Sequence, residues 1–242
     1  MTEGTEGTGG GFNFQQFIED SKNVLIAPKE YFTSMAKEGG LGEPIIKALI
    51  YGALAGIISM IWSIAGLGAI GGALGGAIGG GIGIMILVWA IIGAIVGLFI
   101  GGVIVLVISA ICGGNTDFEA NVRVTASMMV LSPINAVLGI LAGIHFSIGA
   151  IVSLLVSLYG LYLLYQALVN ALAAKEGTAK VVSIVLAVIP ALILASTLVC
   201  ARAVTSQANS WQKQMEKTGN ADAMKKLEQF RKQMEEAAKK NQ

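Results

Sequence analysis

The chain has 242 residues, of which only 13% are charged and 55% are apolar, and its net charge is +1. Soluble domains carry about 25% charged residues, so this composition predicts an integral membrane protein whose first partner is the lipid bilayer. The small net charge gives no reason to expect nucleic acid as a partner.

The N-terminal part divides into two segments. Residues 1–11 are Gly, Thr and Glu with few apolar side chains, and they predict a disordered tail. Residues 12–42 form an amphipathic juxtamembrane segment in which Pro28 suits the first position of a helix. This segment is too short to span a bilayer. We expect it either to lie along the membrane surface as an interfacial helix or to pack on the helices that follow.

Two blocks without any Asp, Glu, Lys or Arg occupy residues 48–116 and 124–174. At about 1.5 Å per residue and about 30 Å of hydrocarbon, they predict an all-α, polytopic bundle over residues 43–202. The charged stretch between them, Asp117–Arg123, is interpreted as a loop at the membrane surface. A tight turn is expected at Gly143–His145. The predicted spans, about five in number, cover residues 45–66, 83–111, 123–143, 148–172 and 180–201.

A four-residue repeat ending in Gly-Gly fills residues 69–80. On a helix it forms a nearly flat stripe along which two backbones approach closely. The favoured arrangement is a long second helix whose first turns include part of this glycine-rich region. A flexible hairpin is the alternative, because each Gly costs a helix about 1 kcal/mol relative to Ala. The candidate helix-packing residues are Gly68, Gly71, Gly72, Gly75, Gly76, Gly79 and Gly80.

The same repeat leaves the number of spans open. With five spans, the lysines and arginines of the C-terminal tail lie on the opposite side from those of the N-terminal segment. A sixth span within the repeat would bring both groups to one side, as the positive-inside rule favours.

Polar groups inside the spans are the natural place to look for chemistry. The predicted spans carry Asp, Glu, Lys and Arg only near their ends, and His145 has no second ligand near it in sequence. We therefore expect no enzyme, no catalytic or metal site and no cofactor. A candidate polar stripe on the fourth span could line a hydrated path, recognise a lipid headgroup or form interhelical hydrogen bonds; it consists of Tyr159, Tyr162, Tyr165, Gln166 and Asn170.

The C-terminal tail, residues 203–242, predicts a charged amphipathic helix with an apolar side of Met and Leu residues. It could pair with copies of itself, bind a partner, lie on a membrane or fold back on the bundle. Cys112 and Cys200 end the second and last predicted spans, so we expect them on opposite faces of the membrane and never joined in one chain.

Three stretches resemble the Yip1 domain family. The first is Gly113-Gly114, followed by Phe118-Glu119-Ala120, Val122-Arg123-Val124 and then Pro133; the others are the tyrosine-rich residues 158–165 and the segment 27–44 around Pro28. The resemblance covers about residues 12–201 and implies a five-span bundle with a cytosolic N-terminus. In eukaryotic members it implies a membrane-organising or trafficking role. The bacterial-type members, which this chain resembles, have no settled activity, and their place is the cytoplasmic (inner) membrane. The family-motif positions are Gly113, Gly114, Phe118 and Pro133.

Two functions follow as hypotheses. The leading one is a non-catalytic protein that organises or shapes membrane, or scaffolds other membrane proteins, and associates with itself through the glycine stripe and the tail. The alternative is a channel or transporter for a small or apolar solute that uses the polar face of the fourth span.

Overall fold

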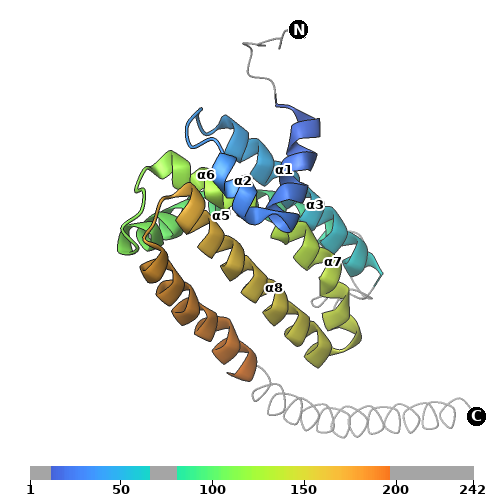
Figure 1. Cartoon of the computed structure of the whole chain (residues 1–242). Coiled ribbons are helices and arrows are strands. Elements are labelled where there is room, and N and C mark those ends of the chain that lie inside the picture. The colour runs from blue at the N-terminus through green and yellow to red at the C-terminus, as the bar shows by residue number, and fades with distance from the viewer. Residues whose placement is uncertain (1–11, 66–80, 197–242) are drawn as a thin grey trace, which may run out of the picture. The chain divides into compact units, whose positions relative to one another are not determined.

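The computed structural model describes residues 12–65 and 81–196, and these are helices joined by short turns (Figure 1). Residues through Leu194 form one unit, and Ala195–Gln242 form a second that lies mostly outside the described residues. The glycine repeat at residues 69–80 and the C-terminal tail also lie outside them. The helices are α1 Phe14–Ile26, α2 Pro28–Ser34, α3 Gly42–Ile64, α5 Gly81–Ile111, α6 Phe118–Met128, α7 Leu131–Ile144, α8 Phe146–Gln166, η1 Ala167–Ala171 and a last helix, Glu176–Ser196.

Five helical stretches of the described chain are long and apolar enough to cross a membrane, which confirms the all-α, multi-span prediction. The turn expected at Gly143–His145 is also confirmed, because α7 ends at Ile144 and α8 begins at Phe146. α5 begins at Gly81 and so contains the end of the glycine-rich region. The five stretches are Gly42–Trp62, Leu87–Ile111, Phe118–Ala142, Ile148–Ala171 and Glu176–Ser196, the last of which we call the fifth span.

The interpretation of Asp117–Arg123 as a surface loop is wrong, since α6 begins at Phe118 and buries Arg123. The Asp117 side chain caps this helix by accepting a hydrogen bond of 2.9 Å from the backbone N–H of Ala120. Glu119 lies in the first turn, where a negative charge is favourable, and pairs with Arg123 one turn later. The charged residues therefore start the third span instead of separating it from the second.

The third span consists of two helices, because the regular pattern stops at Met129–Val130. Pro133 explains the break: it has no N–H to donate to the carbonyl of Met129, and its ring would collide with that carbonyl in a continuous helix. The N–H of Ser132 donates to this carbonyl instead, at 2.9 Å. As a result α6 packs on α5, whereas α7 packs on α3 and α8.

Small residues bring α3 and α5 close together. A Cβ atom placed on Gly56 would lie 2.9 Å from the Cβ of Ala90, and one placed on Gly52 would collide with Ala94. Gly52 and Gly56 are four residues apart on α3, and Ala90 and Ala94 are four residues apart on α5. This is the small-xxx-small arrangement that lets membrane helices approach closely. The described chain thus has a close helix contact of the expected kind, at positions outside the predicted glycine stripe.

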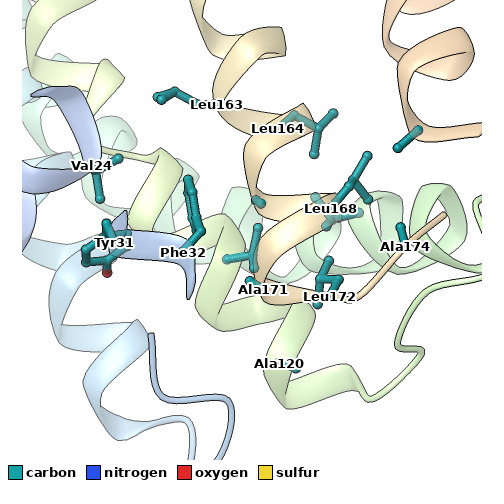
Figure 2. Packing of buried hydrophobic residues seen from close by; sticks show 14 of the residues in the cluster. Val24, Tyr31, Phe32, Ala120, Leu163, Leu164, Leu168, Ala171, Leu172 and Ala174 are labelled. Carbon is teal, nitrogen blue, oxygen red and sulfur yellow. The ribbon is translucent and has the colours of Figure 1, made fainter. Parts of the chain in front are cut away.

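The largest buried cluster joins α2 to the end of α8 and η1 (Figure 2). Phe32 is completely buried there, where α2 packs against η1. η1 is a π-helical turn in which the N–H of Leu172 donates to the carbonyl of Ala167. The amphipathic segment therefore packs on the bundle, which was one of the two arrangements expected for it.

Candidate functional site

A cluster of charged side chains lies where α1, α3 and α6 meet. Lys47, on α3, is buried, and its Nζ donates to Asp20 Oδ2 of α1 at 2.9 Å and to Glu43 Oε1 at 2.8 Å. Glu43 and Lys47 are four residues apart, so they lie on one face of α3 and can form an ion pair at the start of the first span. The Lys47–Asp20 contact ties α1 to the bundle.

Arg123 is only 6% exposed and uses all three of its donor groups. Nε donates to Glu119 Oε1 and Nη1 to Glu43 Oε2, each at 3.0 Å, while Nη2 donates to the carbonyl of Gly40 at 2.9 Å. A planar guanidinium is suited to such a set of fixed partners. Because Glu43 contacts both cations, the four ion pairs form one network.

The turn between α2 and α3 folds over this guanidinium. Gly39 and Gly40 have φ values of +129° and +85°, which favour glycine. A Cβ atom on Gly39 would lie 2.8 Å from Nη2 of Arg123, so a side chain has no room there. The N–H of Gly40 donates to Glu119 Oε1 at 2.6 Å.

Three hydroxyl contacts hold the α1–α2 hairpin from the inside. Ser21 and Tyr51 share a hydrogen bond of 2.7 Å, and Tyr31 and Ser127 share one of 2.8 Å. The hydroxyl of Tyr159 donates to the carbonyl of Leu25. Burial raises the pKa of Tyr31 above its usual value of 10.0, against the opposing effects of Lys47 and the Ser127 hydrogen bond.

A cavity of about 420 Å³ lies beneath the hairpin, and its walls include Asp20, Tyr31, Glu43, Lys47 and Arg123. A second cavity of about 350 Å³ shares several of these residues. Both cations on the wall are already satisfied by carboxylates. The described residues place no group of three His, Cys, Asp or Glu side chains where a metal ion could be held. The arrangement therefore joins helices together.

The predicted polar stripe runs along α8 into η1, and the rings of Tyr159 and Tyr162 lie with their centroids 5.9 Å apart. Gln166 donates to the Tyr162 hydroxyl at 3.0 Å and Asn170 donates to Gln166 Oε1 at 2.9 Å, so these bonds run along the helix itself. Tyr159 contacts α1, and Tyr165 donates to Glu176 at 3.4 Å. The predicted helix-packing glycines, Gly68, Gly71, Gly72, Gly75, Gly76, Gly79 and Gly80, lie outside the described residues.

The Gly113–Gly114 turn is locked to the turn before the fifth span. Gly113 has φ +68°, and the N–H of Asn115 donates to the carbonyl of Leu172 at 2.7 Å, while that of Lys175 donates to the carbonyl of Cys112 at 3.0 Å. A Cβ on Gly114 would lie 2.7 Å from Ser109 Oγ and 2.8 Å from the Leu172 carbonyl oxygen. Two turns distant in sequence thus form one structure, and it requires glycine.

The other two motif positions also have local roles. Phe118 stacks on Phe99 of α5, with ring centroids 6.5 Å apart, and Pro133 lies just after the break in the third span. The Yip1 domain matches residues 22–198, which is most of the chain. The chain belongs to the Yip1 family. The match includes Lys47, Arg123 and the Gly-Gly turn of this Yip1 protein. No curated protein and no solved structure matches it.

The charge network was not predicted from the sequence, in which Arg123 was assigned to a surface loop and Lys47 was only a charge near the end of the first predicted span. A signal was present: Glu43 and Lys47, and Glu119 and Arg123, are both acid-base pairs four residues apart at the start of a span. That spacing indicates two pairs. The distances that join them through Glu43 come only from the packing of α3 against α6.

Proposed function

We propose that this Yip1 protein is a non-catalytic membrane organiser, and that the α1–α2 hairpin shapes the bilayer as a wedge in one leaflet. The observation that carries the proposal is the depth of the hairpin's contacts. Tyr51 and Ser127 each lie nine residues into their spans, which is about 13 Å at 1.5 Å per residue. Half of the hydrocarbon thickness is about 15 Å. The two short helices therefore add volume to one leaflet only.

The outer surface of α1 supports this position. Phe14, Ile18 and Ile26 are 60%, 52% and 71% exposed, although Phe17 and Val24 of the same helix are buried against the bundle. α1 therefore packs one apolar side against the bundle and carries further apolar side chains on its exposed surface. Such a helix suits the membrane–water interface, where the exposed apolar side chains enter the acyl region. The ion pairs of Lys47 keep the wedge fixed to the spans.

Self-association belongs to the same proposal, with the glycine stripe as its candidate contact and another copy or other membrane proteins as the partner. The channel alternative receives less support. The bonds of Tyr162, Gln166 and Asn170 run along α8, and Tyr162 is 46% exposed on the outside of that helix. The cytoplasmic (inner) membrane remains the proposed location.

Vesicles reconstituted with the full chain test the wedge. We expect the wild-type protein to reduce the mean vesicle diameter, measured by electron cryomicroscopy, as the protein-to-lipid ratio rises. The triple variant Phe14→Ser, Ile18→Ser, Ile26→Ser should lose this effect, because its α1 no longer enters the acyl region. The matched control is Gln15→Ser, Glu19→Ser, Lys22→Ser on the same helix. Equal diameters for wild type and the triple apolar variant, at equal incorporation, would contradict the wedge.

A further inference from the structure

A groove of about 460 Å³ runs between α8 and the fifth span. Its floor is apolar and includes Leu158, Leu161, Ile184 and Ala187, while its polar residues include Tyr162, Tyr165 and Lys180. The fifth span is the least buried of the five stretches, and its Ile184 side chain is mostly exposed. The groove therefore opens toward the bilayer, and the question is what fills it.

The polar and apolar parts of the groove lie at different depths in the membrane. Lys180 lies four residues, or about 6 Å, from the start of the fifth span, and Tyr165 lies six residues, or about 9 Å, from the end of the fourth. Ala187 is about 10 Å deeper than Lys180 on the same helix. Leu158 is about 10 Å deeper than Tyr165 on α8. A cation and a phenol thus lie near the headgroup level, and the hydrocarbon walls lie below them.

Lys180 differs from the other cations inside the spans. Lys47 and Arg123 each contact two carboxylates, whereas Lys180 has no acidic partner within the part of the chain that the structure describes. The carboxylate at the same end, Glu176, accepts a hydrogen bond from Tyr165 at 3.4 Å. Lys175, whose side chain lies beside Gly113, adds a second cation at this end. Among the residues that line the groove, Lys180 is the charged one, so the charge at its mouth is positive.

We propose that this groove binds one glycerophospholipid, with its phosphate against Lys180 and one acyl chain along Leu161 and Ile184. The charge at the mouth complements a phosphodiester, and the floor complements an acyl chain. A helix from a second copy would fit less well, because it would cover Lys180 without supplying an anion, and a desolvated unpaired cation is costly. The proposal is independent of the wedge, since α1 and α2 contribute no residue to the groove walls.

Lipid retention by the full chain in mild detergent tests the groove. The protein is loaded with phosphatidylglycerol, washed, and its bound lipid is counted by native mass spectrometry. Ala187→Trp fills the floor and should abolish the retained lipid. Lys180→Gln should weaken retention about fivefold, as expected for one lysine near an anionic surface. The matched controls are Val188→Trp, an exposed position next to Ala187, and Lys29→Gln in α2.

Two further ligands distinguish the phosphate of a lipid from a free phosphate in solution. Soluble glycerol phosphate should not displace the lipid, because the acyl chain contributes most of the buried apolar area. Diacylglycerol, which lacks the phosphate, should be retained as weakly by wild type as phosphatidylglycerol is by Lys180→Gln. Equal retention by Ala187→Trp and Val188→Trp would overturn the proposal. Displacement by glycerol phosphate, or a second copy bound in place of lipid, would overturn it as well.

Discussion

Arg123→Ala removes the centre of the charge network and should loosen the α1–α2 hairpin. The variant loses hydrogen bonds to Glu119, Glu43 and the carbonyl of Gly40. It also leaves the carbonyl of Gly40 without this donor, and Glu119 keeps only the N–H of Gly40. The other cation of the network, Lys47, still contacts Glu43.

The magnitude of the effect follows from the exposure of the partners. Removing one member of a fully buried ion pair costs about 3–5 kcal/mol. Here the Glu43 side chain is 44% exposed and that of Glu119 is 28% exposed, so water can solvate the abandoned carboxylates. We therefore expect a smaller loss, about 2 kcal/mol, close to the cost of a lost hydrogen bond to a charged group. Arg123→Lys should recover only part of this, because an ammonium cannot reproduce the three-way fork.

Two measurements check this prediction. Thermal unfolding in mild detergent reports stability, and maleimide labelling of a Phe17→Cys reporter reports whether α1 detaches from the bundle, since Phe17 is buried against Tyr51. Arg123→Ala should lower the unfolding temperature and accelerate labelling. The control is Lys37→Ala, an exposed residue for which the structure shows no ion pair within its described part. If Arg123→Ala behaves as this control does, the network does not hold the hairpin.

Three further predictions concern other parts of the chain. Gly114→Ala should destabilise the protein by about 1–3 kcal/mol, because its Cβ would press on Ser109 and the Leu172 carbonyl, whereas Gly177→Ala, with nothing within 4 Å, should show no loss in thermal unfolding. Burial raises the folded-state pKa of Tyr31 above its unfolded value of about 10. The neutral side chain therefore stabilises the fold below about pH 10, and this stabilisation is lost as the pH rises through the folded pKa. Tyr31→Phe should remove this alkaline loss from a profile of unfolding free energy against pH. Gly76→Leu should reduce the oligomer size seen in light scattering if the glycine stripe is a contact between copies; an unchanged size would favour the loose hairpin.

The membrane environment and the five long apolar helices of the described residues could be predicted because they depend mainly on composition and length. A block such as residues 48–116 has no charged side chain, and helix rise shows without reference to packing that it is long enough for at least two spans. The Gly113–Gly114 turn was recognisable by resemblance. Its physical reason, the approach of Leu172 across a turn some sixty residues later in the chain, appears only in three dimensions.

The charge network could not be predicted in full because it depends on which helices are neighbours. Glu43 lies at the start of the first span and Arg123 at the start of the third, and only the packing of α3 on α6 brings them within 3.0 Å. The loop interpretation of Asp117–Arg123 failed for a related reason. Charge density was taken as a sign of exposure, although paired charges at the start of a span can be buried. The same applies to Gly52 and Gly56, whose role depends on the position of Ala90 and Ala94.

The final prediction is that Cys112 and Cys200 never form a disulfide within one chain. Cys112 lies beside the start of the fifth span, because its carbonyl accepts a hydrogen bond of 3.0 Å from the N–H of Lys175. The helix Glu176–Ser196 then extends for 21 residues, about 30 Å between its first and last Cα atoms.

Chain geometry opposes the disulfide. Cys200 lies four positions after Ser196, and even a fully extended chain returns by at most about 14 Å over that length. The hydrogen bond to Lys175 keeps the Cα of Cys112 within about 10 Å of that of Glu176, so Cα atoms within about 7 Å of each other, as a disulfide needs, would require the chain after Ser196 to run straight back along the helix at full extension. Oxidation followed by non-reducing mass spectrometry of the monomer should therefore find no intramolecular link. A Cys112–Cys200 link within one chain would mean that the fifth span is not a continuous helix from Glu176 to Ser196. It would thus refute the membrane topology itself, independently of the proposed wedge and the lipid groove.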